Sequence, residues 1–279
     1  DDELEVRAMP ELSAQIHGFV SSSHFDPGQP NNYLLVDVGA GSVDASLFHV
    51  RKDPGGTVSF AFFTDKVELL GAANLNRYRL TWWQSRLRES ERLGTRFPGP
   101  NAARVLPLLS ELEALKLPTD FRGRYPTKFD QYVKGVTVLF NDEATSPDVE
   151  FFEKVVQQVV GKVLYGAWQQ QRLSQTDLKD LPFFLCGGGA RHPLYDALKP
   201  RLQVSPNFTW LRAKPRDLAL PSNIIASGMP HSEYDRLSVA YGLSQLHLKV
   251  FKRAPTLQPI ASTSGQKDWT VSTADKSVC

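Results

Sequence analysis

The sequence predicts an α/β fold in which three antiparallel strands are followed by alternating helices and strands. Two observations carry this prediction. Short apolar runs bounded by turn residues recur between residues 33 and 63, and the connections between them are too short to hold a helix. A long, mostly helical stretch follows these runs, and helical segments then alternate with further short apolar runs. A doubly wound nucleotide fold would alternate strand and helix from the start.

The three strands are predicted at residues 33–38, 43–50 and 58–63. The first reads YLLVDV, which has the size and composition of a buried strand. The second carries apolar residues at alternate positions, and the sequence DPGG at residues 53–56 supplies a turn before the third. Consecutive strands with such short connections pair antiparallel.

A largely helical insertion is predicted after the third strand, at about residues 73–146. Its polar, helical pattern runs from about residue 73 to 117 and is broken by the sequence PGP at residues 98–100. Residues 135–140 are a short strand candidate within the insertion.

The remaining elements alternate helix and strand. Pro147 at a first helical position, acidic residues in the first turn and an apolar face extending to Ala167 predict a helix. Strands are predicted at residues 183–186 and 208–211, and a closing helix at 237–248. This order of elements matches a ribonuclease-H-like layer sandwich.

The folded unit is expected to span residues 1–250. Residues 251–279 are rich in Ser, Thr, Pro and Gln and lose apolar periodicity, which predicts a polar, poorly ordered tail.

Composition excludes several classes of protein. The 279 residues are enough to bury a core, and no apolar run approaches the roughly 20 residues of a membrane span. A net charge of +2 does not favour nucleic acid or a membrane as partner, and we read Trp82 and Trp83 as part of an amphipathic helix rather than a stacking platform. Two cysteines give no disulfide framework and fit a reducing, cytoplasmic location.

The first chemical motif is DVGAGSVD at residues 37–44, directly after a predicted buried strand. Asp37 is placed to hold a water of a magnesium ion, because Mg²⁺ prefers carboxylates and keeps most of its hydration. Gly39 and Gly41 can adopt positive φ and let backbone N–H groups approach phosphate oxygens, and Ser42 adds a hydroxyl. The alternative is a plain glycine turn between two strands.

The second motif is CGGGARHP at residues 186–193, again directly after a predicted buried strand. Successive glycines, including Gly187 and Gly188, allow a flat ligand to lie against bare backbone, and the Arg191 guanidinium can stack on a base. The alternative is a tight strand-to-helix turn with Arg191 as a solvated surface charge.

Together the two motifs resemble the second phosphate loop and the adenosine loop of the actin, sugar kinase and DnaK-type chaperone ATPase superfamily, with DnaK-like members nearest. Residues 9–18 look like the first connecting helix of that superfamily, and residues 237–243 look like the second. The sequence LGA at residues 70–72 looks like a degraded Leu-Gly-Gly segment of the chaperones. The resemblance therefore implies the second lobe of an actin-like ATPase.

The resemblance also implies which residues would bind magnesium ATP or ADP. The magnesium ion would be held through a bound water by Asp37. The β- and γ-phosphates would contact Gly39, Gly41 and Ser42. The adenosine would lie against Gly187, Gly188 and Arg191.

Several positions depart from the superfamily pattern. Met9 stands where a glutamate is expected, Ala40 replaces a glycine, and Gly189 replaces a serine. Glu113-x-x-Lys116 has the spacing of the superfamily's adenosine-clamping Glu and Lys, but the sequence around it matches the superfamily poorly. These departures permit nucleotide binding but weaken the expectation of fast hydrolysis.

No first phosphate loop precedes Asp37, so we expect the chain to be truncated ahead of Asp1 and to need a missing N-terminal lobe for ATP hydrolysis. The first functional hypothesis is thus the ATP-binding half of a nucleotide-dependent conformational switch. The alternative is a catalytically inactive actin-fold module for protein interaction or assembly, with a protein partner or with copies of itself.

Overall fold

The computed structural model describes most of residues 11–245. Described are residues 11–92, 110, 147–218, 221, 224, 234 and 237–245, except 23, 57, 206 and 207. Four of the predicted features therefore lie outside the described residues, namely the break at 98–100, the pair Glu113 and Lys116, the strand at 135–140 and the tail at 251–279.

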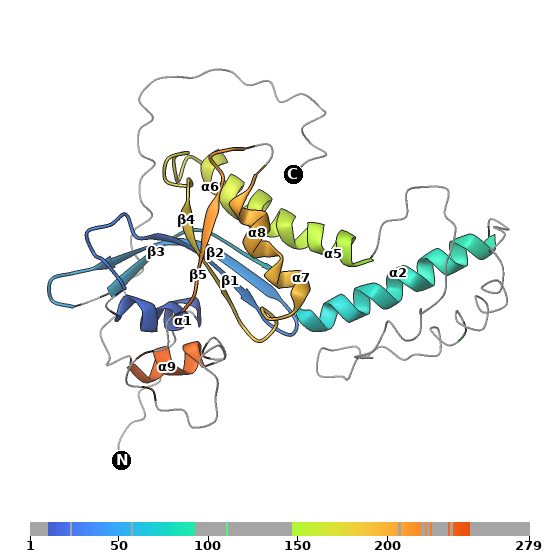
Figure 1. Cartoon of the computed structure of the whole chain (residues 1–279), viewed down its shortest axis with the longest axis horizontal. Coiled ribbons are helices and arrows are strands. Elements are labelled where there is room, and N and C mark those ends of the chain that lie inside the picture. The colour runs from blue at the N-terminus through green and yellow to red at the C-terminus, as the bar shows by residue number, and fades with distance from the viewer. Residues whose placement is uncertain are drawn as a thin grey trace, which may run out of the picture. The chain divides into compact units, whose positions relative to one another are not determined.

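The sheet has five strands in the order β3-β2-β1-β4-β5 (Figure 1). Their bounds are β1 Asn32–Val38, β2 Val43–Lys52, β3 Val58–Glu68, β4 Leu181–Cys186 and β5 Ala213–Arg216. β4 pairs parallel with β1 on one side and with β5 on the other. The short connections between β1, β2 and β3 make those neighbours antiparallel. The result is a mixed α/β sheet of five strands.

Helices precede, follow and interrupt the strands. They are α1 Glu11–Val20, α2 Ala72–Arg92, α5 Pro147–Val156, η2 Gln157–Tyr165, α6 Gly166–Gln169, α7 Pro193–Asp196, α8 Leu198–Gln203 and α9 Ser238–Gln245. α5, η2 and α6 form one continuous helical run, so the predicted helix from Pro147 to Ala167 is confirmed, with π-helical geometry in its middle.

The chain divides into two compact units, which are described separately. The first unit comprises Asp1–Val38, Asp44–Val67 and Val156–Cys279, and the second comprises Gly39–Val43 and Glu68–Val155.

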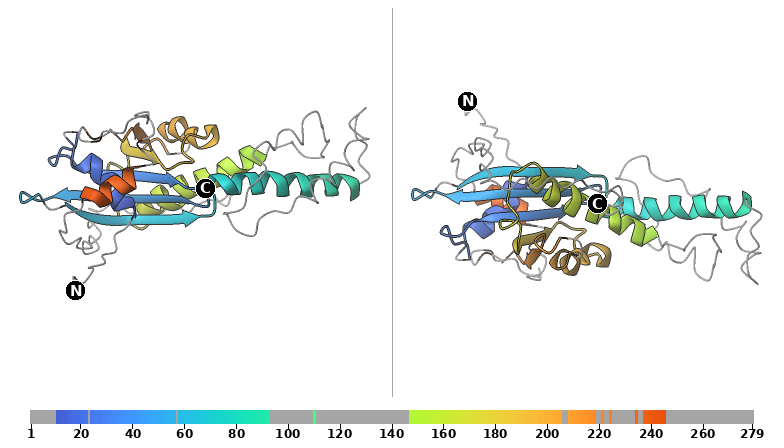
Figure 2. Two further views of the ribbon diagram at one scale, coloured as in Figure 1. Left: turned by 90° about the horizontal axis from the view of Figure 1, so that it is seen from below. Right: turned by 90° about the horizontal axis from the view of Figure 1, so that it is seen from above.

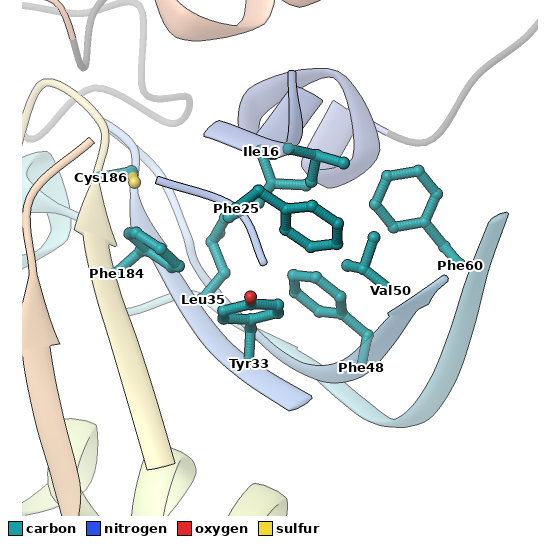
Figure 3. Close-up of a cluster of buried hydrophobic side chains, with 10 residues drawn as sticks. Ile16, Phe25, Tyr33, Leu35, Phe48, Val50, Phe60, Phe184 and Cys186 are labelled. Atoms are coloured by element: carbon teal, nitrogen blue, oxygen red, sulfur yellow. The ribbon is translucent and has the colours of Figure 1, made fainter. Parts of the chain in front are cut away.

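The core of the first unit lies between α1 and the sheet (Figure 3). The side chains of Tyr33 and Leu35 from β1, Phe48 from β2 and Phe184 from β4 meet Ile16 from α1 there. Leu34 and Val36, on the opposite face of β1, are also fully buried. β1 is therefore a central strand with both faces covered, as its continuous apolar run predicts.

Helix η2 is anchored to β3 in the same unit by side-chain hydrogen bonds. Thr64 Oγ1 donates to Val163 O at 3.1 Å, and Gln158 Nε2 donates to Lys66 O at 2.9 Å. These bonds help β3 to continue to Glu68, beyond the predicted end at residue 63.

The strand predicted at residues 208–211 is wrong. Leu211 N donates to Phe208 O at 2.9 Å, which closes a turn there, and the strand follows at β5. The aromatic residues pack on helical neighbours instead of entering the sheet, and the ring centroids of Trp210 and Trp168 are 5.1 Å apart. β5 reads AKPR, and its Pro215 is tolerated because it lies in the last strand of the described sheet order.

In the second unit, α2 packs on α5 through polar side chains. Tyr78 Oη and Trp82 Nε1 donate to the two carboxylate oxygens of Glu150 at 2.8 and 2.9 Å. Arg79 binds both oxygens of Asp148 at 2.6 Å. Trp82 thus belongs to a helix–helix contact, which agrees with its interpretation as part of an amphipathic helix.

No helix among the described residues has the length and apolar character that crossing a membrane requires.

The half-buried histidine of α1, His17, makes stability depend on pH. Burial lowers the pKa of His17, and the nearby positive charge of Lys52 lowers it further. The unfolded chain then binds more protons than the folded one, so this contribution to stability is present above the ordinary histidine pKa and is lost as the pH falls below it. We expect the His17→Gln variant to lose less stability than the wild type between about pH 7.5 and about pH 5 in urea unfolding. Equal losses in both proteins would contradict this assignment.

Candidate functional site

Asp37 lies one residue before the end of β1 and is half-buried. Gln15 Nε2, from α1, donates a 3.0 Å hydrogen bond to Asp37 Oδ2. Gln15 is itself 1% exposed, and its Oε1 has no hydrogen-bond partner among the described residues. The carboxylate is thus oriented from α1 by a side chain that has little freedom to turn away.

The glycine loop after β4 lies directly against Asp37. The parallel register places Asp37 opposite Cys186, so both strands end at the same edge of the sheet. Gly187 has φ +87°, and a Cβ at this position would overlap Asp37 Oδ1 and come 2.5 Å from Val38 O. Gly189 N donates to Val38 O at 2.9 Å. Only glycine fits at position 187, because both the backbone angle and the space exclude a side chain.

The next residues of this loop face open space. Gly188 is exposed, and a Cβ there would meet nothing within 4 Å. Arg191 is exposed as well. His192 caps α7, because its Nδ1 accepts a hydrogen bond from Leu194 N at 3.2 Å. The loop therefore offers bare backbone at Gly188 and a guanidinium nearby in sequence, which suits a flat, polar ligand.

The turn between β1 and β2 belongs to the second unit. It is closed by a 2.9 Å hydrogen bond from Gly39 N to Ser42 O. Its carbonyl groups face the start of α2, since Gly39 O accepts from Ala72 N at 3.1 Å and Ala40 O accepts from Ala73 N at 2.8 Å. The carbonyl groups of the turn are thereby satisfied within the unit.

The backbone N–H groups of the same turn differ from its carbonyl groups. The backbone N–H groups of Ala40 and Gly41 donate to no acceptor within the described part of the chain. Ala40 is exposed and Gly41 is partly exposed. Adjacent backbone N–H groups of a turn are the kind of donors that bind anions in proteins.

Gly71 packs tightly under this turn. A Cβ at Gly71 would come 2.5 Å from Ser42 N and 2.6 Å from Ala40 O. Gly71 N also donates to Gly41 O at 3.3 Å, and Asn74 Nδ2 donates to the same carbonyl at 2.6 Å. The segment before α2 thus fixes the conformation of the turn.

One expectation about the turn is corrected. Among the described residues the glycines with positive φ are Gly56 and Gly187, and neither Gly39 nor Gly41 is among them. The turn closes through the Gly39–Ser42 hydrogen bond and does not need left-handed backbone.

The site residues that the sequence predicts fall into two groups, one in each unit. In the first unit, Asp37 and Gly187 are in contact, and Gly188 and Arg191 follow on the same loop. In the second unit, the turn brings together Gly39, Gly41 and Ser42. Sequence reasoning missed Gln15 and Asn74, and it noted Gly71 only through the resemblance. A polar residue within the apolar face of α1 was the available signal for Gln15.

Of three comparisons with known proteins, the one with solved structures finds similar chains. No protein-family model matches the sequence, and no curated protein does. Among solved structures, the chain is similar to one described as "PilM-PilN type IV pilus biogenesis complex", with a TM-score of 0.41 and 13% sequence identity. The match covers 84% of this chain and 50% of that chain, so this chain spans about half the length of its structural match.

Proposed function

We propose that this chain binds magnesium ATP or ADP as the second lobe of an actin-like ATPase. The observation that carries the proposal is the contact of Asp37 with the Gly187 loop at one edge of the sheet. In an α/β sheet, ligands bind outside the carboxyl ends of the parallel strands, and both residues lie at such ends. The strand order of the sheet supports this superfamily in general and does not favour its DnaK-type members over the others.

The residues present fit a hydrated magnesium ion and a nucleoside. A carboxylate fixed by Gln15 is a suitable acceptor for a magnesium-bound water. Magnesium, when bound, would neutralise charge on the phosphates. The open backbone at Gly188 suits a planar base or ribose, and Arg191 supplies a guanidinium that can stack on the base.

Taken by itself, the turn of the second unit carries donors for an anion such as phosphate. The N–H groups of Ala40 and Gly41 donate to no acceptor among the described residues, and phosphate oxygens need donors of this kind. The Ser42 hydroxyl would add a further donor. In this proposal the nucleotide shifts the protein between conformations through its differential contacts with them.

The proposal is tested with variants that change the ligand surface and leave the fold intact. Gly188→Val places a side chain where the structure is open, and Arg191→Ala removes the stacking cation. We expect each to weaken magnesium-ADP binding by roughly 1 to 3 kcal/mol in calorimetric titration. Urea unfolding of both variants should match the wild type within about 0.5 kcal/mol.

The control is Gly55→Val, an exposed turn glycine of the β2–β3 hairpin with nothing near its Cβ position. It should bind nucleotide like the wild type. Unchanged affinity in both loop variants would favour the second function, an actin-fold module for protein interaction or assembly that does not use nucleotide.

A further inference from the structure

Helix α1 has a face of small residues that is packed against the C-terminal helix of the described chain. Ala14 and Gly18 are one helical turn apart on α1, and α9 lies alongside it (Figures 1 and 2). A Cβ on Gly242 of α9 would overlap Ala14 O and come 2.5 Å from Ala14 C. The two helices thus meet backbone to backbone at this point.

The second contact of this face is made by Tyr234. A Cβ on Gly18 would overlap Tyr234 Oη and come 3.3 Å from the ring of Tyr241. Tyr234 is 1% exposed, and its hydroxyl has no hydrogen-bond partner among the described residues. Among the described residues, the hydroxyl therefore acts on α1 only by filling the space beside Gly18.

The residue after Ala14 on α1 is Gln15, which holds Asp37. Gln15 follows directly on the backbone that Gly242 contacts, and its Nε2 reaches Asp37 Oδ2 at 3.0 Å. A hydrogen bond of this kind weakens steeply when either group moves by a fraction of an ångström or turns. A small shift of α1 away from α9 would therefore weaken this hydrogen bond before other contacts.

We propose that Tyr234 and α9 act as positioning elements for Asp37, by holding α1 where Gln15 can donate to the carboxylate. The idea rests on the proposed function for its consequence, since a displaced Asp37 would hold magnesium nucleotide less well. The positioning itself is a property of the protein without ligand.

The test uses a substitution pair that creates and then relieves an overlap. Gly18→Ala adds a methyl group that overlaps Tyr234 Oη, and the double variant Gly18→Ala/Tyr234→Phe removes that oxygen. The readout is the exchange rate of the Gln15 side-chain amide protons in nitrogen-15 NMR, with Gln15→Leu used to identify their signals. A merely structural role of Gly18 would not move this rate in a folded protein.

We expect Gly18→Ala to speed exchange of the Gln15 amide protons by about fivefold or more, because the hydrogen bond to Asp37 is weakened. The double variant should return the rate to that of the wild type. Gly166→Ala is the matched control, since the nearest atom to its Cβ is 3.8 Å away, and it should leave the rate unchanged. Tyr234→Leu, which loosens the contact without overlap, should speed exchange even if Gly18→Ala does not fold.

Unchanged exchange in folded Gly18→Ala, or in Tyr234→Leu, would overturn the positioning role. A faster rate that Tyr234→Phe does not restore in the double variant would overturn the role of the hydroxyl contact. The same proteins titrated with magnesium-ADP separate the two proposals. If the exchange rates change as expected and no protein binds nucleotide, positioning stands and the proposed function fails.

Discussion

The Gly187→Ala variant is expected to be the most damaging single-methyl change in the candidate site, with a loss of roughly 2 to 4 kcal/mol in the free energy of unfolding. Two costs add together. The residue has φ +87°, which an L-residue with a side chain rarely adopts, and the new methyl would overlap Asp37 Oδ1 and approach Val38 O to 2.5 Å. Neither neighbour can move away without a cost in free energy, since Val38 O is a backbone atom and Asp37 is held by the hydrogen bond from Gln15.

Gly188→Ala is the matched control for this prediction, because it adds the same methyl to the next residue of the same loop. The position is open and its φ is not positive, so we expect a change within about 0.5 kcal/mol. Urea unfolding of the two variants measures the difference. If the two variants unfold at the same denaturant concentration, the assigned backbone geometry of the loop is wrong.

Gly71→Ala is expected to have the next largest effect, a loss of roughly 2 to 3 kcal/mol through overpacking against the turn between β1 and β2. The methyl would come 2.5 Å from Ser42 N and 2.6 Å from Ala40 O and Gly41 C, all of them backbone atoms. The turn would have to move away from the start of α2. The hydrogen bonds from Ala72 N and Ala73 N to the turn should therefore weaken.

Amide hydrogen exchange at Ala72 and Ala73 measures this displacement directly. Gly39→Ala is the control, because its nearest non-neighbour atom, Ser42 O, would be at an ordinary 3.5 Å from the added Cβ. We expect faster exchange at both amides in Gly71→Ala and wild-type rates in Gly39→Ala. Protected amides in a folded Gly71→Ala protein would show that the turn does not depend on this glycine.

The central strands β1 and β4 were predictable because burial on two faces leaves a clear pattern. β1 and β4 are continuous apolar runs, and the hairpin connections between β1, β2 and β3 are marked by glycine, proline and aspartate. β5 was not predictable in the same way. Its sequence AKPR is polar and short, whereas the aromatic run before it has the composition of a strand and instead packs on Tyr165 and Trp168.

The candidate site was predictable in its residue types but not in its supports. Asp37 and Gly187 are far apart in the sequence, yet each follows a buried run, and parallel neighbours end at one edge of a sheet. Neither Gln15 nor Gly71 directly follows a buried apolar run that would identify it in the sequence. Their roles depend on which side chain a helix turns toward Asp37 and on how closely a turn is approached, and both follow from tertiary packing rather than from local pattern.

The most direct test of the central claim is a calorimetric titration of the chain with ADP, in the presence and absence of magnesium, for the wild type and for Asp37→Asn. We expect the wild type to bind ADP more tightly with magnesium, because Asp37 would accept a hydrogen bond from a water of the metal. In Asp37→Asn the metal should no longer strengthen binding, while binding of ADP alone should persist. A wild type that binds no ADP, or an Asp37→Asn variant that keeps the full magnesium dependence, would contradict the account.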